Sequence, residues 1–459
     1  MTHAVIIGAG LGGLACALFL ARRGHEVDLF ERDGDDPPAD PPSAFASWTR
    51  RGLPQARQGH GFLGLSSEVL KTEAPDVLDR LVEAGASVID MTNHPLPQVK
   101  LLAVRRLVYE AVLRQAVAAE TRVRIHRGAT VDGLIAEPGS SPPRVIGLRT
   151  AAGQDCRGDL VIDASGRWTK GAEWLAAVGA RPWRDDVSET PFVYVTRHYR
   201  LKAGEVFPVP LVASSVDLSY GGATTFKGDD GAFAMAFLTS TFDPYRGALT
   251  KADRFHAVME AIPAMAAWTS IATPINEPLA LGRIDNRLRS LVDGEGPVAS
   301  GYVLLGDAAM HTNPVFARGV SLAYAQARQL AATIEQQPAD PLGYAVAFEA
   351  WTREHINVWY PGSVQADLSK AAQMARSCRG EDAPAGPMAA VGNAMWALAI
   401  NDPDLARRWA RLNHLLDPPA KLFGDPMVMS RVQPYVAGHQ GLVPDDALSR
   451  GDFEAIVTA

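Results

Sequence analysis

A glycine-rich turn between an apolar strand and a helix is the strongest constraint on how this chain can fold. The segment Gly8–Gly13 reads G-A-G-L-G-G and directly follows the apolar run Ala4–Ile7. It opens a helix-like segment, Leu11–Arg23, which is followed by a second short strand, Glu26–Phe30, with Glu31 at its end. Strand, glycines, helix, strand and terminal acid in this order predict a βαβ unit of a parallel sheet.

This unit has the pattern of a dinucleotide-binding site. The first glycine permits a tight turn, the second lets the backbone approach a pyrophosphate, and the third allows the helix to pack closely on the strand. The helix N-terminus offers N–H donors to phosphates, and a carboxylate at the second strand end can accept hydrogen bonds from both ribose hydroxyls. An acid there disfavours a 2′-phosphate, which leaves FAD or NAD; a tight turn without a ligand is the alternative. The candidate cofactor-binding residues of this unit are Gly8, Gly10, Gly12, Gly13, Glu31 and Arg32.

Length and composition predict an ordinary globular protein of two or three domains. The chain has 459 residues, of which 47% are hydrophobic and 21% charged. A net charge of −7 without blocks of like charge argues against a nucleic-acid partner. Cys16, Cys156 and Cys378 lie far apart in the sequence, so neither a disulfide framework nor a metal site is expected, and a reducing cytosol fits best.

The apolar run Ala4–Ala21 could also be a secretory signal. No basic residue precedes it, glycines interrupt it, and Glu26, Asp28 and Glu31 follow soon after. Elsewhere no apolar stretch is long enough to span a bilayer. We therefore expect a cytoplasmic protein without an integral membrane segment.

The rest of the chain alternates between two structural patterns. Helices are expected at Ser66–Ala84, Arg105–Glu120 and about Gly319–Gln336, and the C-terminal part from Pro341 is mostly helical. Further strands are expected at Ala129–Leu134, Arg144–Thr150, Leu160–Ile162 and Tyr302–Leu305, and an antiparallel sheet at Phe192–Arg200, Val209–Tyr220 and Ala232–Leu238. The predicted fold is α/β (α+β overall), with a Rossmann-type domain interleaved with an antiparallel-sheet domain and followed by a helical region. The expected limits are 1–75, 100–180 and 285–340 for the FAD-binding domain, 76–99 and 181–284 for the substrate domain, and 341–459 for the helical region.

Two later motifs favour FAD over NAD. Asp163–Arg167, D-A-S-G-R, follows one buried strand, and Gly306–Ala309, G-D-A-A, follows another. A strand that ends in Gly-Asp can present a carboxylate to a ribityl hydroxyl. The turn Asn313–Gly319, with its proline and glycine, then opens a helix whose N-terminus suits the negative charge of a reduced flavin.

In these three motifs, over roughly residues 1–340, the chain resembles the FAD-dependent monooxygenases of the aromatic-hydroxylase fold, including squalene-epoxidase-like enzymes and polyether epoxidases. The resemblance implies that Asp307 binds the ribityl chain, that Gly319 and Val320 lie near the flavin, and that Arg106 reaches the FAD. It also implies that Arg50 or Arg51 approaches the flavin and that Asp163 and Arg167 contact FAD and transient NAD(P)H. The chain departs from the family pattern at Ala164, Met310 and Ala317; the first puts the NAD(P)H role in question.

Several polar and aromatic residues are weaker candidates. Arg57–Gly61, R-Q-G-H-G, lies beside the flavin or forms a surface turn, and Arg57 and His60 are the weak candidates for catalysis. His311 lies near the ring or only packs a loop. Trp48, Trp168, Trp174 and Trp183 line a pocket or belong to the core. The halogenase motif W-x-W-x-I-P is absent, so halogenation is not expected.

The resemblance implies a monooxygenase that hydroxylates or epoxidises an apolar, electron-rich aromatic or alkene through a flavin C4a-hydroperoxide, in specialised metabolism. FAD is held non-covalently, O2 is the co-substrate, and NAD(P)H or a separate flavin reductase supplies electrons. The alternatives are a flavin-dependent reductase of an isoprenoid-like alkene and a flavin-binding protein without turnover. The expected assembly is a monomer or a homodimer.

Overall fold

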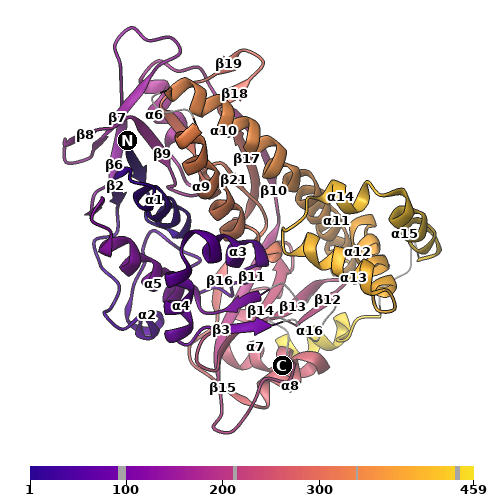
Figure 1. Cartoon of the computed structure of the whole chain (residues 1–459). Helices are drawn as coiled ribbons and strands as arrows, with labels where there is room; N and C mark the ends of the chain where they lie inside the picture. The colour runs from indigo at the N-terminus through magenta and orange to yellow at the C-terminus, as the bar shows by residue number, and fades with distance from the viewer. Residues whose placement is uncertain (91–99, 210–213, 337–339, 440–444) are drawn as a thin grey trace.

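A five-stranded parallel sheet organises the N-terminal two thirds of the chain (Figure 1). The computed structural model describes residues 1–90, 100–209, 214–336, 340–439 and 445–459. Four of the strands were expected from the sequence, whereas β5, at the sheet edge, was not predicted. The strands in spatial order are β20 (Tyr302–Leu304), β9 (Leu160–Asp163), β1 (His3–Ile7), β2 (Glu26–Glu31) and β5 (Val123–Arg127).

Both faces of this sheet are covered, as is typical of parallel sheets. Alternate side chains of β1 point to opposite faces: Ala4 and Ile6 pack against helices, and Val5 and Ile7 against a small antiparallel sheet. The helices on the first face are α1 (Leu11–Arg22), α3 (Gly64–Glu73), α4 (Pro75–Glu83), α5 (Arg106–Ala119) and α9 (Gly319–Gln336). The second face carries β6 (Val131–Ala136), β7 (Val145–Thr150), β8 (Asp155–Arg157) and α6 (Gly171–Ala177).

A six-stranded antiparallel sheet is inserted between β9 and β20, as the interleaved pattern predicted. Its two longest strands pair from Phe192 opposite Ser240 to Arg200 opposite Ala232. One face packs on α7 (Ala252–Ala261), α8 (Pro263–Thr269) and α16 (Arg450–Thr458), so the last helix returns to this sheet. The opposite face lines a pocket. The strands are β11 (Phe192–Leu201), β12 (Ser215–Leu218), β13 (Gly221–Lys227), β14 (Ala232–Ser240), β15 (Ala272–Pro274) and β16 (Leu279–Leu281).

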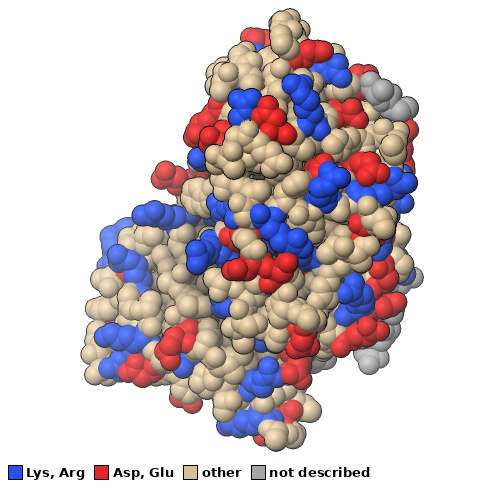
Figure 2. All heavy atoms as spheres, turned by 90° about the vertical axis from the view of Figure 1, so that its left-hand side faces the viewer, with Lys and Arg blue, Asp and Glu red and all other residues tan. Residues whose placement is uncertain are grey.

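The first helix of the region that begins at Pro341 packs on the helices that cover the parallel sheet, and the later helices form a lobe at the side of the two sheets (Figure 1). The helices of this region are α10 (Pro341–His355), α11 (Tyr360–Cys378), α12 (Pro387–Ala399), α13 (Pro403–Asn413), α14 (Pro419–Phe423) and α15 (Pro426–His439). Smaller strands connect the parts: β10 (Arg184–Glu189), β17 (Asp285–Ser290) and β21 (Met310–His311) form one sheet, β18 (Val292–Asp293) and β19 (Gly296–Pro297) a second, and β3 (Ser87–Asp90) and β4 (Lys100–Ala103) a third. Acidic and basic side chains are interspersed on the face that Figure 2 shows. The proposed domain limits stay a prediction.

Two local expectations need correction. The helix expected at 66–84 is two helices, because Pro75 begins the second one and Ala74 before it has an extended φ of −152°. The strand expected at Val209–Tyr220 is four residues long in the described part of the chain, Ser215–Leu218, and residues 210–213 of that expectation lie outside the described residues.

Candidate functional site

The carboxyl ends of the parallel strands meet at one edge of the sheet and form one wall of a large pocket. Ile7 of β1 lies opposite Phe30 of β2 and Asp163 of β9, and Leu304 of β20 lies opposite Asp163 on the other side. The three sequence motifs directly follow these strand ends. Their turns therefore face the same crevice, which is where open α/β sheets bind ligands.

The glycines of the turn between β1 and α1 are required for different structural reasons. Gly8 has a φ of +99°, and a Cβ at Gly13 would lie 2.0 Å from the carbonyl oxygen of Gly8. A Cβ at Gly12 would lie 3.1 Å from the Cβ of Ala323 in α9. Gly10, in contrast, faces open space in the pocket, with no protein atom within 4 Å of an added Cβ. The turn therefore has tight internal packing and one open position for a ligand to approach the backbone.

The pocket has a volume of about 670 Å³. It extends from the edge of the parallel sheet where β1, β2, β9 and β20 end, here called the nucleotide edge, to the antiparallel sheet. That size is within the usual range for small-molecule and cofactor sites. Of the sequence-predicted cofactor residues, all but Gly13 and Asp163 line it: Gly8, Gly10, Gly12, Glu31, Arg32, Arg50, Arg106, Asp307, Gly319 and Val320. The opposite wall comes from one face of the antiparallel sheet: Tyr194, Thr196, Thr224, Phe226, Ala236 and Leu238.

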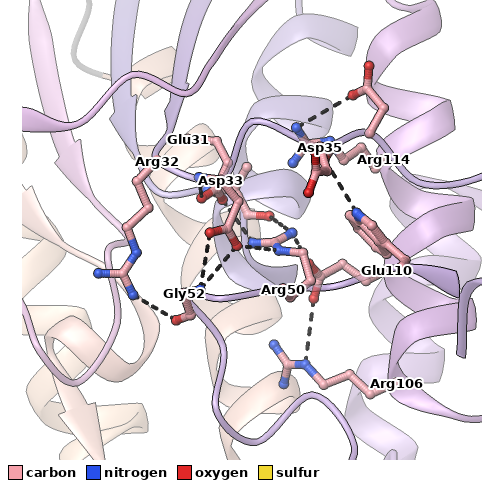
Figure 3. Close-up of polar contacts among 12 residues, drawn as sticks. Glu31, Arg32, Asp33, Asp35, Arg50, Gly52, Arg106, Glu110 and Arg114 are labelled. Atoms are coloured by element: carbon pink, nitrogen blue, oxygen red, sulfur yellow. Dashed lines mark hydrogen bonds and ion pairs between the residues drawn. The ribbon is translucent and has the colours of Figure 1, made fainter. Parts of the chain in front are cut away.

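Glu31 is held at the nucleotide edge by three donors (Figure 3). Its carboxylate accepts hydrogen bonds from the backbone N–H groups of Ala9 (3.0 Å) and Asp33 (2.9 Å) and from Nη2 of Arg50 (2.9 Å). Arg50 also pairs with Asp33 through Nε and with Glu110 through Nη1. Burial opposes the charge of Arg50, but the carboxylates of Glu110, Glu31 and Asp33 raise the pKa of its guanidinium. The expected flavin-facing Arg50 thus lies beside Glu31, where three carboxylates bind its guanidinium.

Arg32 and Arg51 lie at the exposed side of this cluster. Nη2 of Arg32 donates to the carbonyl oxygen of Gly52 at 2.9 Å, and Arg32 lines the pocket. Arg51 is exposed and is not among the lining residues.

Asp307 and the start of α9 lie together at the other end of the edge. A Cβ at Gly319 would lie 3.4 Å from Oδ1 of Asp307. Nη1 of Arg289 donates to the carbonyl oxygens of Asp307 (3.3 Å) and Ala308 (3.0 Å), which fixes the turn that carries the carboxylate. The two parts of the third motif are therefore adjacent, as the family pattern implies.

Asp163 has a different environment from the one the motif suggested. It is fully buried and lies outside the pocket lining. Its Oδ1 accepts hydrogen bonds from the N–H (2.9 Å) and hydroxyl (2.5 Å) of Ser165, and its Oδ2 accepts from Thr169 and from the hydroxyl of Tyr302 (2.7 Å). Its side chain therefore fixes the turn whose residues Ala164–Trp168 line the pocket, and a direct cofactor contact stays a prediction.

Comparison with known proteins shows the fold of this chain and the proteins it is similar to. Residues 6–36 match the model of the NAD(P)-binding Rossmann-like domain. The chain is 27% identical over 365 residues to Protein Rv3254 of Mycobacterium tuberculosis, covering 72% of each chain. It is 32% identical over 168 residues to kynurenine 3-monooxygenase of Salinispora arenicola, covering 35% of each chain. The structure of the flavin-dependent brominase Bmp2 superposes with a TM-score of 0.63 at 16% identity, covering 95% of this chain and 100% of that one.

The chain carries the NAD(P)-binding Rossmann-like domain of FAD-dependent monooxygenases, and its relatives and structural neighbours include a monooxygenase and a flavin-dependent halogenase. The match to kynurenine 3-monooxygenase spans about a third of each chain, and the likeness to the brominase shows the fold alone. The expected α/β fold and an FAD-dependent oxidoreductase are thereby confirmed. The activity on a particular substrate is a separate question.

The pocket of this flavoprotein fits FAD on observations from its own residues. Gly10 leaves backbone open to a pyrophosphate, Glu31 lies where a ribose would bind, and Asp307 lies beside the N-terminus of α9. When bound, FAD supplies the redox centre that reacts with O2. The described residues contain no group of three or more His, Cys, Asp or Glu side chains suited to a metal ion. None of the helices described here combines the length and apolar character needed to cross a membrane.

The segment Arg57–Gly61 divides between structural and pocket-lining roles. Arg57 donates to the carbonyl oxygens of Phe45 (3.1 Å) and Trp48 (3.0 Å) and does not line the pocket. Gln58 and His60 do line it; Gln58 accepts a hydrogen bond from Thr196 at 2.6 Å, which connects the segment to the antiparallel sheet.

His60 is a neutral side chain in this environment. Its Nδ1 lies 3.0 Å from the carbonyl oxygen of Gln58 and its Nε2 lies 3.4 Å from Nη1 of Arg106. Burial and the positive charge of Arg106 lower the pKa of His60 to about 3. An imidazole that donates from Nδ1 and accepts at Nε2 satisfies both neighbours. His60 therefore orients Arg106 toward the pocket, and its role as a general base stays a weak prediction.

Some of the four tryptophans and His311 line the pocket, and the others belong to the core. Trp168 and Trp174 line the pocket, whereas Trp48 is buried beside α5 and Trp183 packs behind the parallel sheet. His311 also lines the pocket, and its Nε2 lies 3.2 Å from Asp285 of β17.

Three interactions of the site were not predicted. Arg105, before α5, donates to Asp229 from its backbone N–H and twice from its guanidinium. Tyr194 of the antiparallel sheet donates to Asn313, whose amide nitrogen donates to Asp367 of α11 at 2.7 Å. In the third, Arg318, from the turn Asn313–Gly319, donates to the hydroxyl of Ser363 in α11. These pairs are far apart in sequence and belong to no recognisable motif.

Proposed function

We propose that this flavoprotein is a monooxygenase that hydroxylates or epoxidises an apolar, electron-rich aromatic or alkene, in specialised metabolism. The observation that supports it is one continuous pocket between the nucleotide edge and the antiparallel sheet. Phe226, Ala236 and Leu238 give that far wall an apolar character, while Thr196 and Tyr194 add hydroxyl groups. Such a wall would orient an apolar substrate over the flavin and exclude water from the reaction.

The residues of the chain have separate tasks in this proposal. The turn Gly8–Gly13 and Glu31 bind the nucleotide half of FAD, and Asp307 and the N-terminus of α9 bind the flavin half. Arg106, oriented by His60, faces the pocket beneath the antiparallel sheet. The division into FAD-binding, substrate and C-terminal parts belongs to the same proposal, as does the choice between NAD(P)H and a separate reductase as the source of electrons.

The test follows the flavin and the oxygen atom together. The purified protein is reconstituted with FAD and reduced anaerobically by NADH or NADPH, with and without polyene or aromatic compounds, and is then exposed to 18O2. Incorporation of one labelled atom into the organic product supports the proposal. Reduction of the alkene without labelled product would instead indicate a reductase. A flavin that neither nucleotide reduces is then reduced by a separate flavin reductase, and the labelled product is sought again.

A further inference from the structure

Arg318 lies near the end of the turn Asn313–Gly319, between the pocket and the C-terminal helices. It directly precedes α9, and its side chain lines the pocket. Its guanidinium carbon lies 4.3 Å from the ring centroid of Phe316 and 4.9 Å from that of Trp359 in the C-terminal region. Stacking between two aromatic rings fixes the plane of a guanidinium and leaves its edge for hydrogen bonding.

Its hydrogen-bonding capacity is mostly unused. Nη1 donates to the hydroxyl of Ser363 at 2.7 Å, and that hydroxyl donates to the carbonyl oxygen of Trp359 at 2.8 Å. Among the residues that the structure describes, no carboxylate forms an ion pair with Arg318. Asp367 is the acidic group that acts on it, but both of its oxygens accept amide hydrogen bonds, from Asn286 and Asn313, at 2.7 Å.

The remaining donors of Arg318, a residue that lines the pocket, are not sealed in the protein interior without a partner. A guanidinium has five N–H groups. In the described part of the chain several buried polar atoms lack a hydrogen-bond partner, but no nitrogen of Arg318 is one of them. Burial lowers the pKa of Arg318 to about 10, so that it remains protonated at neutral pH. Arg50 and Arg105, in contrast, have their charges neutralised by carboxylates of the chain.

We propose that Arg318 binds the carboxylate of the substrate, so that the pocket selects an aromatic or unsaturated carboxylic acid. The inference rests on the proposed function and names the substrate class for the same site. A planar guanidinium matches a carboxylate with two parallel hydrogen bonds, and Phe316 and Trp359 hold it in position.

The test measures binding to the oxidised holoprotein, without turnover. Benzoate and benzamide, which have nearly the same shape but differ in charge, are titrated against the FAD-loaded protein and followed by flavin absorbance and calorimetry. We expect benzoate to bind roughly 10- to 100-fold more tightly than benzamide. Arg318→Gln should abolish this preference and Arg318→Lys should retain part of it. Arg283→Gln, at an exposed arginine of the same pocket lining, is the matched control and should leave the preference unchanged.

Equal binding of benzoate and benzamide to the wild-type protein would overturn the proposal, as would an unchanged preference in Arg318→Gln or chloride competing as tightly as benzoate. If Arg318→Gln does not retain FAD, the wild-type comparison and Arg318→Lys still decide. Because no oxygenation takes place in this measurement, its failure is distinct from a failure to find a labelled product.

Discussion

At the residue scale, one buried arginine organises the charges at the nucleotide edge. The side chain of Arg50 is 3% exposed, and its partners Glu31, Asp33 and Glu110 are 5%, 9% and 0% exposed. Buried carboxylates of like charge are stable only with a cation among them. Glu31 therefore depends on Arg50 for its position at the edge of the pocket.

Arg50→Gln should destabilise the protein by about 3–5 kcal/mol, because it leaves several buried carboxylates without their cation. Urea unfolding measures this loss, and the ratio of flavin to protein absorbance measures retention of FAD, which should also fall. Arg149→Gln removes an exposed pair with Asp155 and should change little. An Arg50→Gln protein as stable as the wild type would contradict a structural role for the cluster.

At the element scale, different glycines of the turn between β1 and α1 serve packing and ligand binding. Gly13 touches the backbone of Gly8, whereas Gly10 has no protein atom near its missing side chain. Both positions belong to the same glycine pattern in the sequence. The structure therefore predicts that equal substitutions at the two positions have different effects.

Gly13→Ala should disrupt folding, because its methyl carbon would lie 2.0 Å from a carbonyl oxygen. Gly10→Ala should cost the apoprotein about 1 kcal/mol or less, since it changes only a helix N-cap. It should nevertheless weaken FAD binding by about tenfold or more, equivalent to about 1.4 kcal/mol. Thermal unfolding without FAD and an FAD titration distinguish the two effects; equal loss of stability in both variants would refute the separation.

At the scale of the whole molecule, buried neutral histidines make stability depend on pH. Burial lowers the pKa of His60 and His198 to about 3 and that of His414 to about 4, from the ordinary histidine value of about 6.5. Below pH 6.5 the unfolded chain binds protons at these sites and the folded chain does not. Their contribution to stability is therefore lost as the pH falls from about 6.5 toward 3.

His198→Gln should make the stability less dependent on pH. Each such histidine contributes a slope of about 1.4 kcal/mol per pH unit well below pH 6.5, because unfolding takes up one proton. Urea unfolding from pH 8 to 5 should therefore show a slope smaller by up to this amount in the variant. Above pH 7.5 the slopes should coincide, since the imidazole is neutral in both states. Identical slopes at pH 5 would mean that His198 is protonated in the folded protein.

The nucleotide edge was predictable from the sequence alone, because its signals are local. Glycine spacing, strand ends and helix starts depend on neighbouring residues, and the structure has Gly8, Gly10, Gly12, Glu31, Asp307 and Gly319 in the lining of one pocket. The order of the three motifs likewise determined the interleaved fold. The alternation of β11 and β14 indicated an antiparallel sheet, although not which face would line the pocket.

Only the tertiary structure decided which charges meet. Arg50 and Glu110 are 60 residues apart, Arg105 and Asp229 are 124 apart, and Arg318 and Ser363 are 45 apart. The sequence around a charged residue does not identify its distant partner, because such pairs form only when separate elements pack together. The same reason explains why the sequence did not predict that Asp163 is buried beneath a turn; its contact with the cofactor stays a prediction. The sequence thus determined which turns meet at the end of the parallel sheet, because their signals are local, and packing across distant segments decided which residues shape the rest of the pocket.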